Sequence, residues 1–304
     1  MKPVLKSGFI FALCFAFFVG LPTKLLASSC YENLAVLTGN LPFESVENSV
    51  FIKDRRAVLE SPNRHDVVDF IVSSVEKLGF KAKLQNGQDM NKPGVKLTNV
   101  IVRLNSNKLA PKIVVGAHYD SAAPFEAADD NGTGVVAMFE LMERLKDQEL
   151  KTNLEFVFFD AEEFIVEEHF MGSQLYTSRL GMWGRQEIKQ AVILDMLGRH
   201  TPKQENTLGI SHNTLNDDIV ENFLKGRPKS QFKVVSLMEG NTYISDAMHF
   251  ARYKIPVSLF CDVLDMPFTM SYAHTEHDTL KNIDWDYFHH SVDEIERYIL
   301  EAAN

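Results

Sequence analysis

Short apolar segments alternate with amphipathic segments along most of this chain of 304 residues. The five clearest apolar segments are "TNVIVRL" (98–104), "KIVVGAH" (112–118), "LEFVFFD" (154–160), "AVILD" (191–195) and "IPVSLFCD" (255–262). Each is apolar at most positions rather than at every second position, which is typical of strands covered by helices on both faces. The sequence therefore predicts an α/β protein with a largely parallel central sheet.

The segments between these strands carry apolar residues at helical spacing. Residues 66–80, 132–145 and the segment from Trp285 onward each place them on one face of a helix, and Gly79 is expected to end the first. No repeat and no proline-rich linker interrupts residues 30–304. We therefore expect a single domain with helices on both faces of the sheet.

The first 29 residues have the pattern of a secretory signal peptide. Lys2 and Lys6 precede fourteen mostly apolar residues, 8–21, and small residues follow at 27–29. This stretch is shorter than the ~20 residues that span a bilayer. We expect cleavage and export to the periplasm or beyond, with no stable membrane span left in residues 30–304. Cys30 directly follows the small residues, so a lipid anchor on this cysteine is an alternative to simple release.

The net charge of the chain argues against nucleic acid as a partner. The formal net charge is −10, and loss of residues 1–29 removes three lysines and no acid. Such an acidic chain is not expected to bind nucleic acid.

Two cysteines, Cys30 and Cys261, would remain after loss of residues 1–29. They are too few for a disulfide framework or a thiolate metal site. Cys261 is expected to be a small buried hydrophobe, with a disulfide to Cys30 as the alternative. The sequence contains no signal for an oligomeric state.

Acidic residues and histidines gather where the predicted strands end. They are His118 and Asp120, Asp129 and Asp130 before the next helix, Asp160 with Glu162 and Glu163, Asp195, and His274, His277 and Asp278 in "YAHTEHDT". The carboxyl ends of parallel strands are where such sheets bind ligands. So many carboxylates would repel one another unless cations lay among them. A metal cluster is the simplest explanation.

Each motif alone has a simpler interpretation. His118 could be a hydrogen-bonded histidine, and residues 129–132 form a good loop and helix-cap sequence. Glu162 and Glu163, with two further glutamates nearby, could be a solvated charge run. Their order along the chain, each at or just beyond a predicted strand end, favours the metal site over these separate explanations.

The motifs also resemble those of a known family. "GAHYDS", "ADDNGTG", "FFDAEE", "LDM", "SDAMHF" and "YAHTEHDT" occur in order between residues 116 and 279. They are similar to the blocks of the dizinc exopeptidases (zinc peptidase family twenty-eight) that include bacterial leucyl aminopeptidase, aminopeptidase S and aminopeptidase Y. The resemblance implies a zinc-dependent exopeptidase fold and a metallo-aminopeptidase that acts on peptide or aminoacyl substrates.

The resemblance also implies a role for each matching residue. His118 and Asp195 would hold one Zn²⁺, Glu163 and His274 the other, and Asp130 would bridge the two. His274 is chosen over His277 because it directly precedes a threonine in the family's block. Histidine and carboxylate ligands suit Zn²⁺, two per chain, with Mn²⁺ or Co²⁺ as alternatives. Asp129 and Asp160 are expected to be structural, and His289 and His290 to be solvated or packed.

Two further acids have implied catalytic or supporting roles. Asp120 resembles the acid that holds the far imidazole nitrogen of a metal-binding histidine, here His118. Glu162 is the candidate general base, which would move a proton from water, acidified by the metals to a pKa of about 7, to the leaving amine. If the segment is extended, Glu162 and Glu163 point to opposite sides. One can then bind metal while the other faces the substrate.

Two departures from the family pattern leave alternatives open. "FIVEEHFM" (164–171) is longer than the matching loop of shorter members and resembles the single-zinc glutaminyl cyclases. A glutaminyl-peptide cyclotransferase is therefore the alternative, although its pattern lacks the complete two-metal set. "SDAMHF" has Ala247 where the family usually has histidine, so the supporting role of Asp246 is open. A binding module of the same fold without catalysis would be expected to have lost ligands or the base.

Overall fold

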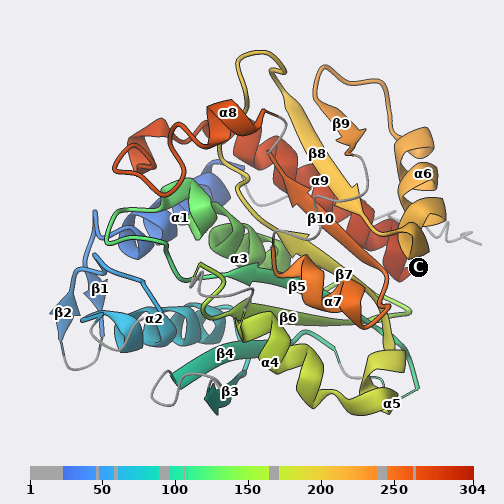
Figure 1. Ribbon diagram of the computed structural model, residues 1–304, viewed down its shortest axis with the longest axis horizontal. Helices are drawn as coiled ribbons and strands as arrows, with labels where there is room; N and C mark the ends of the chain where they lie inside the picture. Colours follow the sequence, from blue (N-terminus) through green and yellow to red (C-terminus); the bar gives the residue numbers. More distant parts are fainter. Residues whose placement is uncertain are drawn as a thin grey trace, which may run out of the picture.

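The predicted strands form the centre of one twisted sheet (Figure 1). The computed structural model describes residues 23–304 except 46–47, 58–60, 89–95, 106, 108, 164–170, 238–244 and 263–264. The sheet has eight strands in the order β3-β4-β6-β5-β7-β10-β8-β9. Their bounds are β3 Ala82–Gln88, β4 Lys96–Arg103, β5 Lys112–His118, β6 Asn153–Phe159, β7 Ile188–Leu194, β8 Thr207–His212, β9 Lys233–Ser236 and β10 Val257–Cys261.

The centre of the sheet is parallel and its flanks are mixed. Strands β6, β5, β7 and β10 run parallel to their neighbours within this group, and β8 is parallel to β9. The pairings β3 with β4, β4 with β6, and β10 with β8 are antiparallel. This confirms the predicted α/β fold with a largely parallel sheet. The strands that carry the predicted site motifs are all in the parallel centre.

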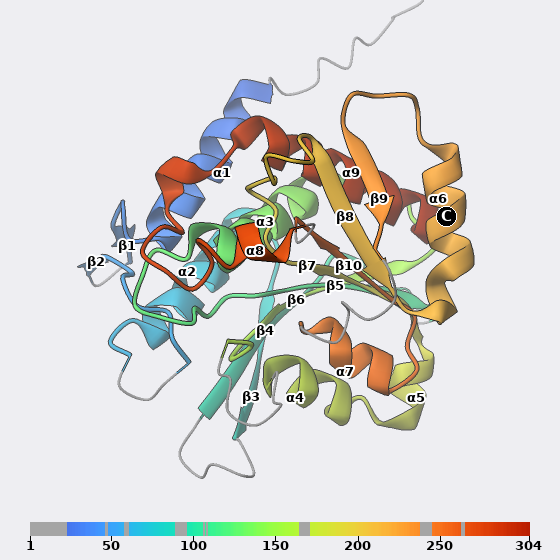
Figure 2. The ribbon, with the colours of Figure 1, turned by 45° about the horizontal axis from the view of Figure 1, so that its top comes forward.

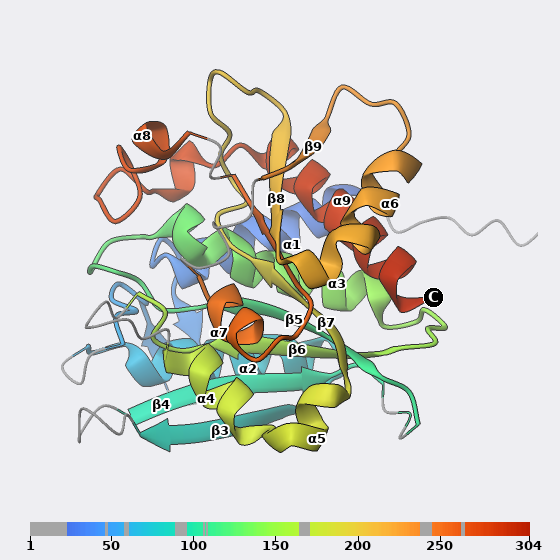
Figure 3. The same ribbon diagram turned by 45° about the vertical axis from the view of Figure 1, so that its right-hand side comes forward.

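Helices cover both faces of the sheet, as predicted (Figures 2 and 3). One face carries α1 Thr23–Leu37, α2 Arg64–Lys77, α3 Gly134–Leu145, α6 Asp217–Gly226 and α9 Trp285–Ala303, which share the larger apolar core. The other carries α4 Met171–Arg179, α5 Gly181–Gln186 and α7 Ala247–Arg252 around a second core. Short elements complete the fold: β1 Phe43–Glu44, β2 Ser49–Val50, α8 Met266–Thr269 and the single turns Ala128–Thr133, Thr214–Asn216 and Leu280–Asn282.

The three predicted helices are present, and α9 begins at Trp285 as predicted, while the other two have shifted ends. Helix α2 begins two residues before the predicted segment, and Gly79 follows it at a φ of 91°, a value that glycine adopts without strain. Helix α3 begins at Gly134 rather than 132, because residues 128–133 form a separate irregular turn. That turn carries Asp129 and Asp130 toward the predicted site.

The chain near the predicted signal cleavage point is helical. Residues 1–22 of the predicted signal peptide lie outside the described residues, and α1 crosses the expected boundary between Ser29 and Cys30. In the described part of the chain, no helix combines the length and apolarity needed to cross a membrane. Cys30 and Cys261 are buried in the two different cores and form no disulfide with each other.

Candidate metal centre

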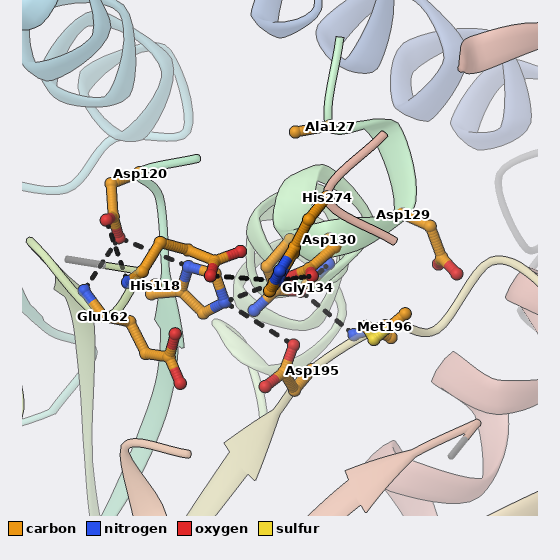
Figure 4. A network of polar contacts seen from close by, with 12 residues as sticks. His118, Asp120, Ala127, Asp129, Asp130, Gly134, Glu162, Asp195, Met196 and His274 are labelled. Carbon is orange, nitrogen blue, oxygen red and sulfur yellow. Dashed lines mark hydrogen bonds and ion pairs between the residues drawn. The ribbon is translucent and has the colours of Figure 1, made fainter. Parts of the chain in front are cut away.

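Three neighbouring parallel strands end at the same edge of the sheet and present the predicted site residues there. His118 ends β5 and pairs in register with Phe159 at the end of β6, while β7 on the other side ends at Leu194. The residues that follow these strands therefore emerge together. Figure 4 shows the resulting cluster. It gathers the side chains of His118, Asp120, Asp130, Glu162, Glu163, Asp195 and His274.

Within this cluster, two ligand sets meet at one carboxylate. His118 Nε2 lies 3.5 Å from Asp130 Oδ1 and 3.6 Å from Asp195 Oδ1. On the other side, His274 Nε2 lies 3.1 Å from Asp130 Oδ2 and 3.0 Å from Glu163 Oε2. The two oxygens of Asp130 therefore face different histidines. Each set, with Asp130 common to both, has its donor atoms within 4.8 Å of one another.

The donor atoms fit zinc in type and spacing. Tetrahedral zinc with ligand bonds of about 2.1 Å separates neighbouring ligand atoms by roughly 3.4 Å. The four distances from the Nε2 atoms of His118 and His274 to the carboxylate oxygens of their sets, 3.0 to 3.6 Å, lie close to that value. Two carboxylate oxygens in the cluster, Asp195 Oδ1 and Glu163 Oε1, are buried and have no hydrogen-bond donor among the described residues. Buried oxygens without donors are costly unless a cation satisfies them.

Burial and mutual repulsion perturb the charges of the cluster. Burial first, and then the nearby Asp130 carboxylate, raise the pKa of Glu163 to about 8. Burial also acts to raise the pKa of Asp130, but hydrogen bonds from His118 and His274 hold it below its usual value. Hydrogen bonds to Asp130 and Glu163 raise the pKa of His274 to about 10. The site thus attracts positive charge strongly, which is the condition for binding a cation.

Asp120 contacts one residue of each set, His118 through its ring and Glu163 through its backbone N–H. Its Oδ1 lies 3.3 Å from His118 Nδ1, the nitrogen that faces away from Asp130. The same carboxylate accepts the backbone N–H groups of Glu162 at 3.0 Å and Glu163 at 3.1 Å. One buried acid therefore orients the His118 ring and also fixes the backbone of the two glutamates.

The backbone at these glutamates differs from the extended segment expected from the sequence. Ala161 has a φ of 60°, and residues 162–163 form a bend rather than a continuation of β6. The bend is needed because both N–H groups must turn toward the single carboxylate of Asp120. The Glu162 carboxylate still lies beside His118, in a group that also contains Glu163. Burial raises the pKa of Glu162 well above its ordinary value.

The loop that carries Asp130 is held by residues from two other segments. The carboxylate of Asp278 accepts the N–H groups of Asp129 at 2.8 Å and Asp130 at 2.9 Å. The side chain of Asn131 donates to the carbonyl of Leu194 and accepts from the N–H of Met196, on either side of Asp195. The peptide bond between Asp130 and Asn131 is cis. These contacts fix Asp130 and Asp195 relative to each other.

The two acids expected to be structural do bond to the protein rather than point into the cluster. Asp129 Oδ1 accepts the N–H of Gly198 at 2.7 Å, and its Oδ2 accepts the Tyr272 hydroxyl, which also contacts Asp262. Asp160 Oδ2 accepts Arg64 Nη2 and the N–H of Thr98, both at 2.8 Å. Both acids are buried.

The remaining histidines named from the sequence lie apart from the metal-binding groups found among the described residues. His277 is exposed, and His289 and His290 lie on α9, where both rings pack against aromatic side chains at an angle. Asp246 is buried at the start of α7, and burial raises its pKa to about 7, while the nearby charge of His118 acts to lower it. Ala247, which replaces the family's usual histidine, packs in the second core.

Arg55 is a buried cation beside the site that sequence reasoning did not find. Its guanidinium donates to the carbonyls of Tyr119, Glu126 and Ala127, which flank the loop leading to Asp130. Burial lowers its pKa to about 10, while the charges of Asp278, Asp120 and other acids act to raise it. No local motif marks this arginine, because its burial depends on contacts with residues more than sixty positions away.

Left-handed backbone conformations also concentrate at the site. Among the described residues, six non-glycine residues have positive φ, and four of them lie in the segments that build the cluster: Ala127 (46°), Ala161 (60°), Met196 (55°) and His274 (59°). This conformation is unfavourable for residues with a side chain and tends to persist where the surrounding structure enforces it. The cluster is therefore a preorganised feature of the fold.

Curated relatives of this chain include two aminopeptidases. Probable lipoprotein aminopeptidase LpqL of Mycobacterium tuberculosis is 30% identical over 143 residues, which cover 45% of this chain and 28% of the relative. Aminopeptidase YwaD of Bacillus subtilis is 27% identical over 213 residues, which cover 67% of this chain and 44% of the relative. The matches thus span less than half of each relative's own length.

Solved structures with a similar fold include enzymes of two activities. A zinc aminopeptidase from Bacillus subtilis superimposes with a TM-score of 0.68 at 17% identity, covering 91% of this chain and 95% of that chain. A glutaminyl cyclase from Porphyromonas gingivalis superimposes with a TM-score of 0.64 at 17% identity, covering 90% and 97%. At this identity the similarity shows the fold of zinc exopeptidases and not which of the two reactions is catalysed.

A protein-family model extends from β4 to α9 and so includes every residue of the cluster. It is the model described as "Peptidase family M28", and it matches residues 99–299. The matched segment contains β4 to β10, both ligand sets and the bend at Glu162. On this match, the chain belongs to peptidase family M28.

Proposed function

We propose that this protein is a two-zinc aminopeptidase that hydrolyses the N-terminal bond of peptides or aminoacyl compounds. The observation that carries the proposal is the sharing of Asp130 between the set of His118 and Asp195 and the set of Glu163 and His274. A site for a single ion would not need a carboxylate whose two oxygens face different histidines 3.1 and 3.5 Å away.

These distances support the ligand roles that the motifs imply. His118 and Asp195 would hold one Zn²⁺, Glu163 and His274 would hold the other, and Asp130 would be common to both. When bound, the zinc pair acts as a Lewis acid that polarises the scissile carbonyl and lowers the pKa of water to about 7. Asp120 keeps the Nε2 of His118 directed at the metal by holding Nδ1.

Glu162 is the general base of the proposed reaction. Its carboxylate is buried next to His118 but belongs to neither set that contains Asp130. It takes a proton from the attacking water and delivers it to the amine that leaves. Burial raises the pKa of Glu162, which makes its carboxylate a stronger base. Binding of the substrate's free α-amine in the metal site makes the enzyme an exopeptidase.

A substrate panel tests the reaction directly. Purified protein loaded with zinc is incubated with aminoacyl amides, the matching N-acetylated compounds and peptides with N-terminal glutamine, and the products are identified by mass. We expect loss of one residue from free N-termini only. Loss of ammonia from N-terminal glutamine would replace this proposal by a cyclase.

The glutaminyl cyclase is the second candidate, because the Porphyromonas gingivalis enzyme shares the fold. The loop that first suggested it, residues 164–171, lies almost entirely outside the described residues. Elemental analysis discriminates the two activities independently of turnover. We expect about two zinc ions per chain for the aminopeptidase, and one firmly bound ion would favour the cyclase.

We also propose that residues 1–29 direct export and are removed, leaving the exopeptidase domain at 30–304 in the periplasm or outside the cell. The name of the LpqL relative is consistent with an exported lipoprotein. Cys30 Sγ is buried and donates to Glu140 Oε2 at 2.5 Å, however, so a lipid on this sulfur would displace the end of α1 from the core. Release without a lipid is therefore the favoured form, and the mass of the mature N-terminal peptide tests it.

A further inference from the structure

A patch of exposed aromatic and basic side chains lies far from the metal centre. Met182 and Trp183 on α5 are 64% and 75% exposed, and Tyr253 after α7 is 36% exposed. The guanidinium carbon of Arg185 lies 3.5 Å from the centre of the Tyr253 ring, so α5 and the end of α7 are in contact. Figures 1 and 3 show these two helices near each other on one face of the sheet.

This patch faces away from the substrate site. Helix α5 lies directly before the first residue of β7, whereas Asp195 follows the last. A strand of seven residues is roughly 23 Å long. Side chains on α5 are therefore about that distance from the metal ligands and take no part in the proposed reaction.

The charges around the patch are opposite in sign to those of the whole protein. The chain carries a net charge of −10, but residues 177–187 and 251–254 contain four basic side chains and a single acid, Glu187. The basic residues are Arg179, Arg185, Arg252 and Lys254, all exposed or half-buried. We call these four residues, together with Met182, Trp183 and Tyr253, the Trp183 patch.

The contacts of the patch hold its basic groups around the aromatic side chains. Arg179 donates to the carbonyl of Asn86, and Arg185 donates to the carbonyl of Thr177 at 3.0 Å. Neutral carbonyls accept these bonds, so the positive charges are not cancelled. Trp183 projects from a short helix with three quarters of its surface in solvent, rather than lining a groove that a folded partner would fill.

We propose that the Trp183 patch docks the protein on an anionic phospholipid surface. Tryptophan prefers the interface between lipid headgroups and acyl chains, and arginine and lysine with long apolar stems suit the same depth. Anionic headgroups attract basic clusters within a Debye length of the surface. Because the rest of the chain is acidic and repelled, the molecule binds in one orientation, with the metal centre directed away from the lipid.

Vesicle binding and tryptophan fluorescence test this docking. The chain has two tryptophans, so Trp285→Phe leaves Trp183 as the one reporter. We expect sedimentation with vesicles of phosphatidylcholine and phosphatidylglycerol at low salt, a blue shift of Trp183 emission, and at least tenfold less binding to phosphatidylcholine alone. Raising the salt to 1 M, where the Debye length is about 3 Å, should release the protein.

Charge variants with a matched control identify the surface. Arg252→Glu with Lys254→Glu should lower the fraction bound at least fivefold, and Trp183→Ala should do the same. Lys229→Glu with Lys233→Glu makes the same change in net charge on exposed residues elsewhere and should leave binding unchanged. Peptidase activity and circular dichroism verify that each variant is folded.

Three results would overturn the proposal. The first is equal binding to neutral and anionic vesicles, as a lipid anchor alone would give. The second is vesicle binding that both pairs of charge variants weaken equally. The third is the absence of vesicle binding together with a dimer that Trp183→Ala dissociates, which would make the patch an interface between two copies of this chain.

Discussion

Buried carboxylates are neutralised differently at the two edges of the parallel sheet, the one where its strands begin and the one where they end. At the edge where β6 begins, Glu155 is buried and accepts from Arg103 Nε at 2.5 Å, Lys112 Nζ at 2.6 Å and the Tyr176 hydroxyl at 2.5 Å. Burial acts to raise its pKa, but Lys112 and the other donors hold it below its usual value. The protein therefore neutralises this acid with its own cations.

At the edge where β5, β6 and β7 end, the protein supplies too few cations. Burial raises the pKa of Glu163 to about 8, and the buried Arg55 donates to backbone carbonyls rather than to the carboxylates. The comparison separates two uses of buried charge. Glu155 is neutralised by protein partners alone, whereas the acids around Asp130 would be neutralised by the proposed metal ions.

Replacing Asp130 should have the largest effect on metal binding at the edge where the strands end. Asp130→Ala removes the one ligand common to both sets, so we expect the zinc content to fall from about two to well below one per chain. Turnover should then fall at least as far as in any single catalytic variant. Elemental analysis and aminopeptidase assays measure the two effects. Asp195→Ala is the matched control, because it removes a ligand from one set and should leave one ion bound.

Glu162→Gln should separate chemistry from metal binding at the same edge. The amide keeps the size of the side chain but cannot accept the proton, so we expect turnover to fall by a factor on the order of 10² to 10⁴. Zinc content should stay near that of the unmodified protein, because Glu162 belongs to neither Asp130 set. Unimpaired hydrolysis by this variant would show that another group is the base.

The sequence predicted the centre of the fold better than its flanks. Strands β4 to β7 and β10 were recognisable because they are buried on both faces and almost continuously apolar. Strand β3, "AKLQNGQ", was missed because it is an edge strand whose residues are mostly exposed and polar. Strand β9 was also missed, since it has four residues and lies at the other edge of the sheet. Strand β8, "TLGISH", lies inside that edge and was missed because a glycine and polar residues interrupt its apolar positions.

The site shows the same division between local and distant determinants. The acids and histidines could be chosen from motifs because each follows a strand end, and the structure brings all seven together. The bend at Glu162 could not be predicted, because it depends on the carboxylate of Asp120 more than forty residues away. Arg55 was missed for the same reason, since nothing near it in the sequence indicates that it is buried.

Glu155→Gln tests the opposite edge. The substitution leaves the mostly buried Lys112 without its counter-charge, and breaking a buried pair in this way costs roughly 3 kcal/mol of unfolding free energy. Arg103 is largely exposed and adds little to this cost. We expect zinc content and the turnover of folded protein to remain unchanged. Thermal unfolding and elemental analysis together check this. Loss of zinc from this variant would mean that the two edges are coupled.

The dependence of the unfolding free energy on pH in the acid range gives a second measurement on Glu155. Its pKa is lower in the folded protein than in the unfolded chain, where glutamate has a pKa near 4.3. Its contribution is therefore present above about pH 4.3 and is lost as pH falls through the lowered value. Measured without zinc, Glu155→Gln should flatten the fall in stability below pH 4. An unchanged pH dependence would contradict this assignment.

The last prediction concerns the stabilisation of the whole fold by zinc. A ligand that binds only the folded state at 100 times its dissociation constant adds about 2.7 kcal/mol to the unfolding free energy, and two sites with a shared ligand add more. We expect the unfolding midpoint of the chelated protein to rise by several degrees when zinc is restored. Asp130→Ala should lose nearly all of this rise, and Glu155→Gln should keep it from a lower starting point. That pattern would show that the edge rich in unpaired acids, and not the edge that carries its own cations, obtains stability from the metal. An equal response of both variants would place the zinc effect elsewhere on the protein.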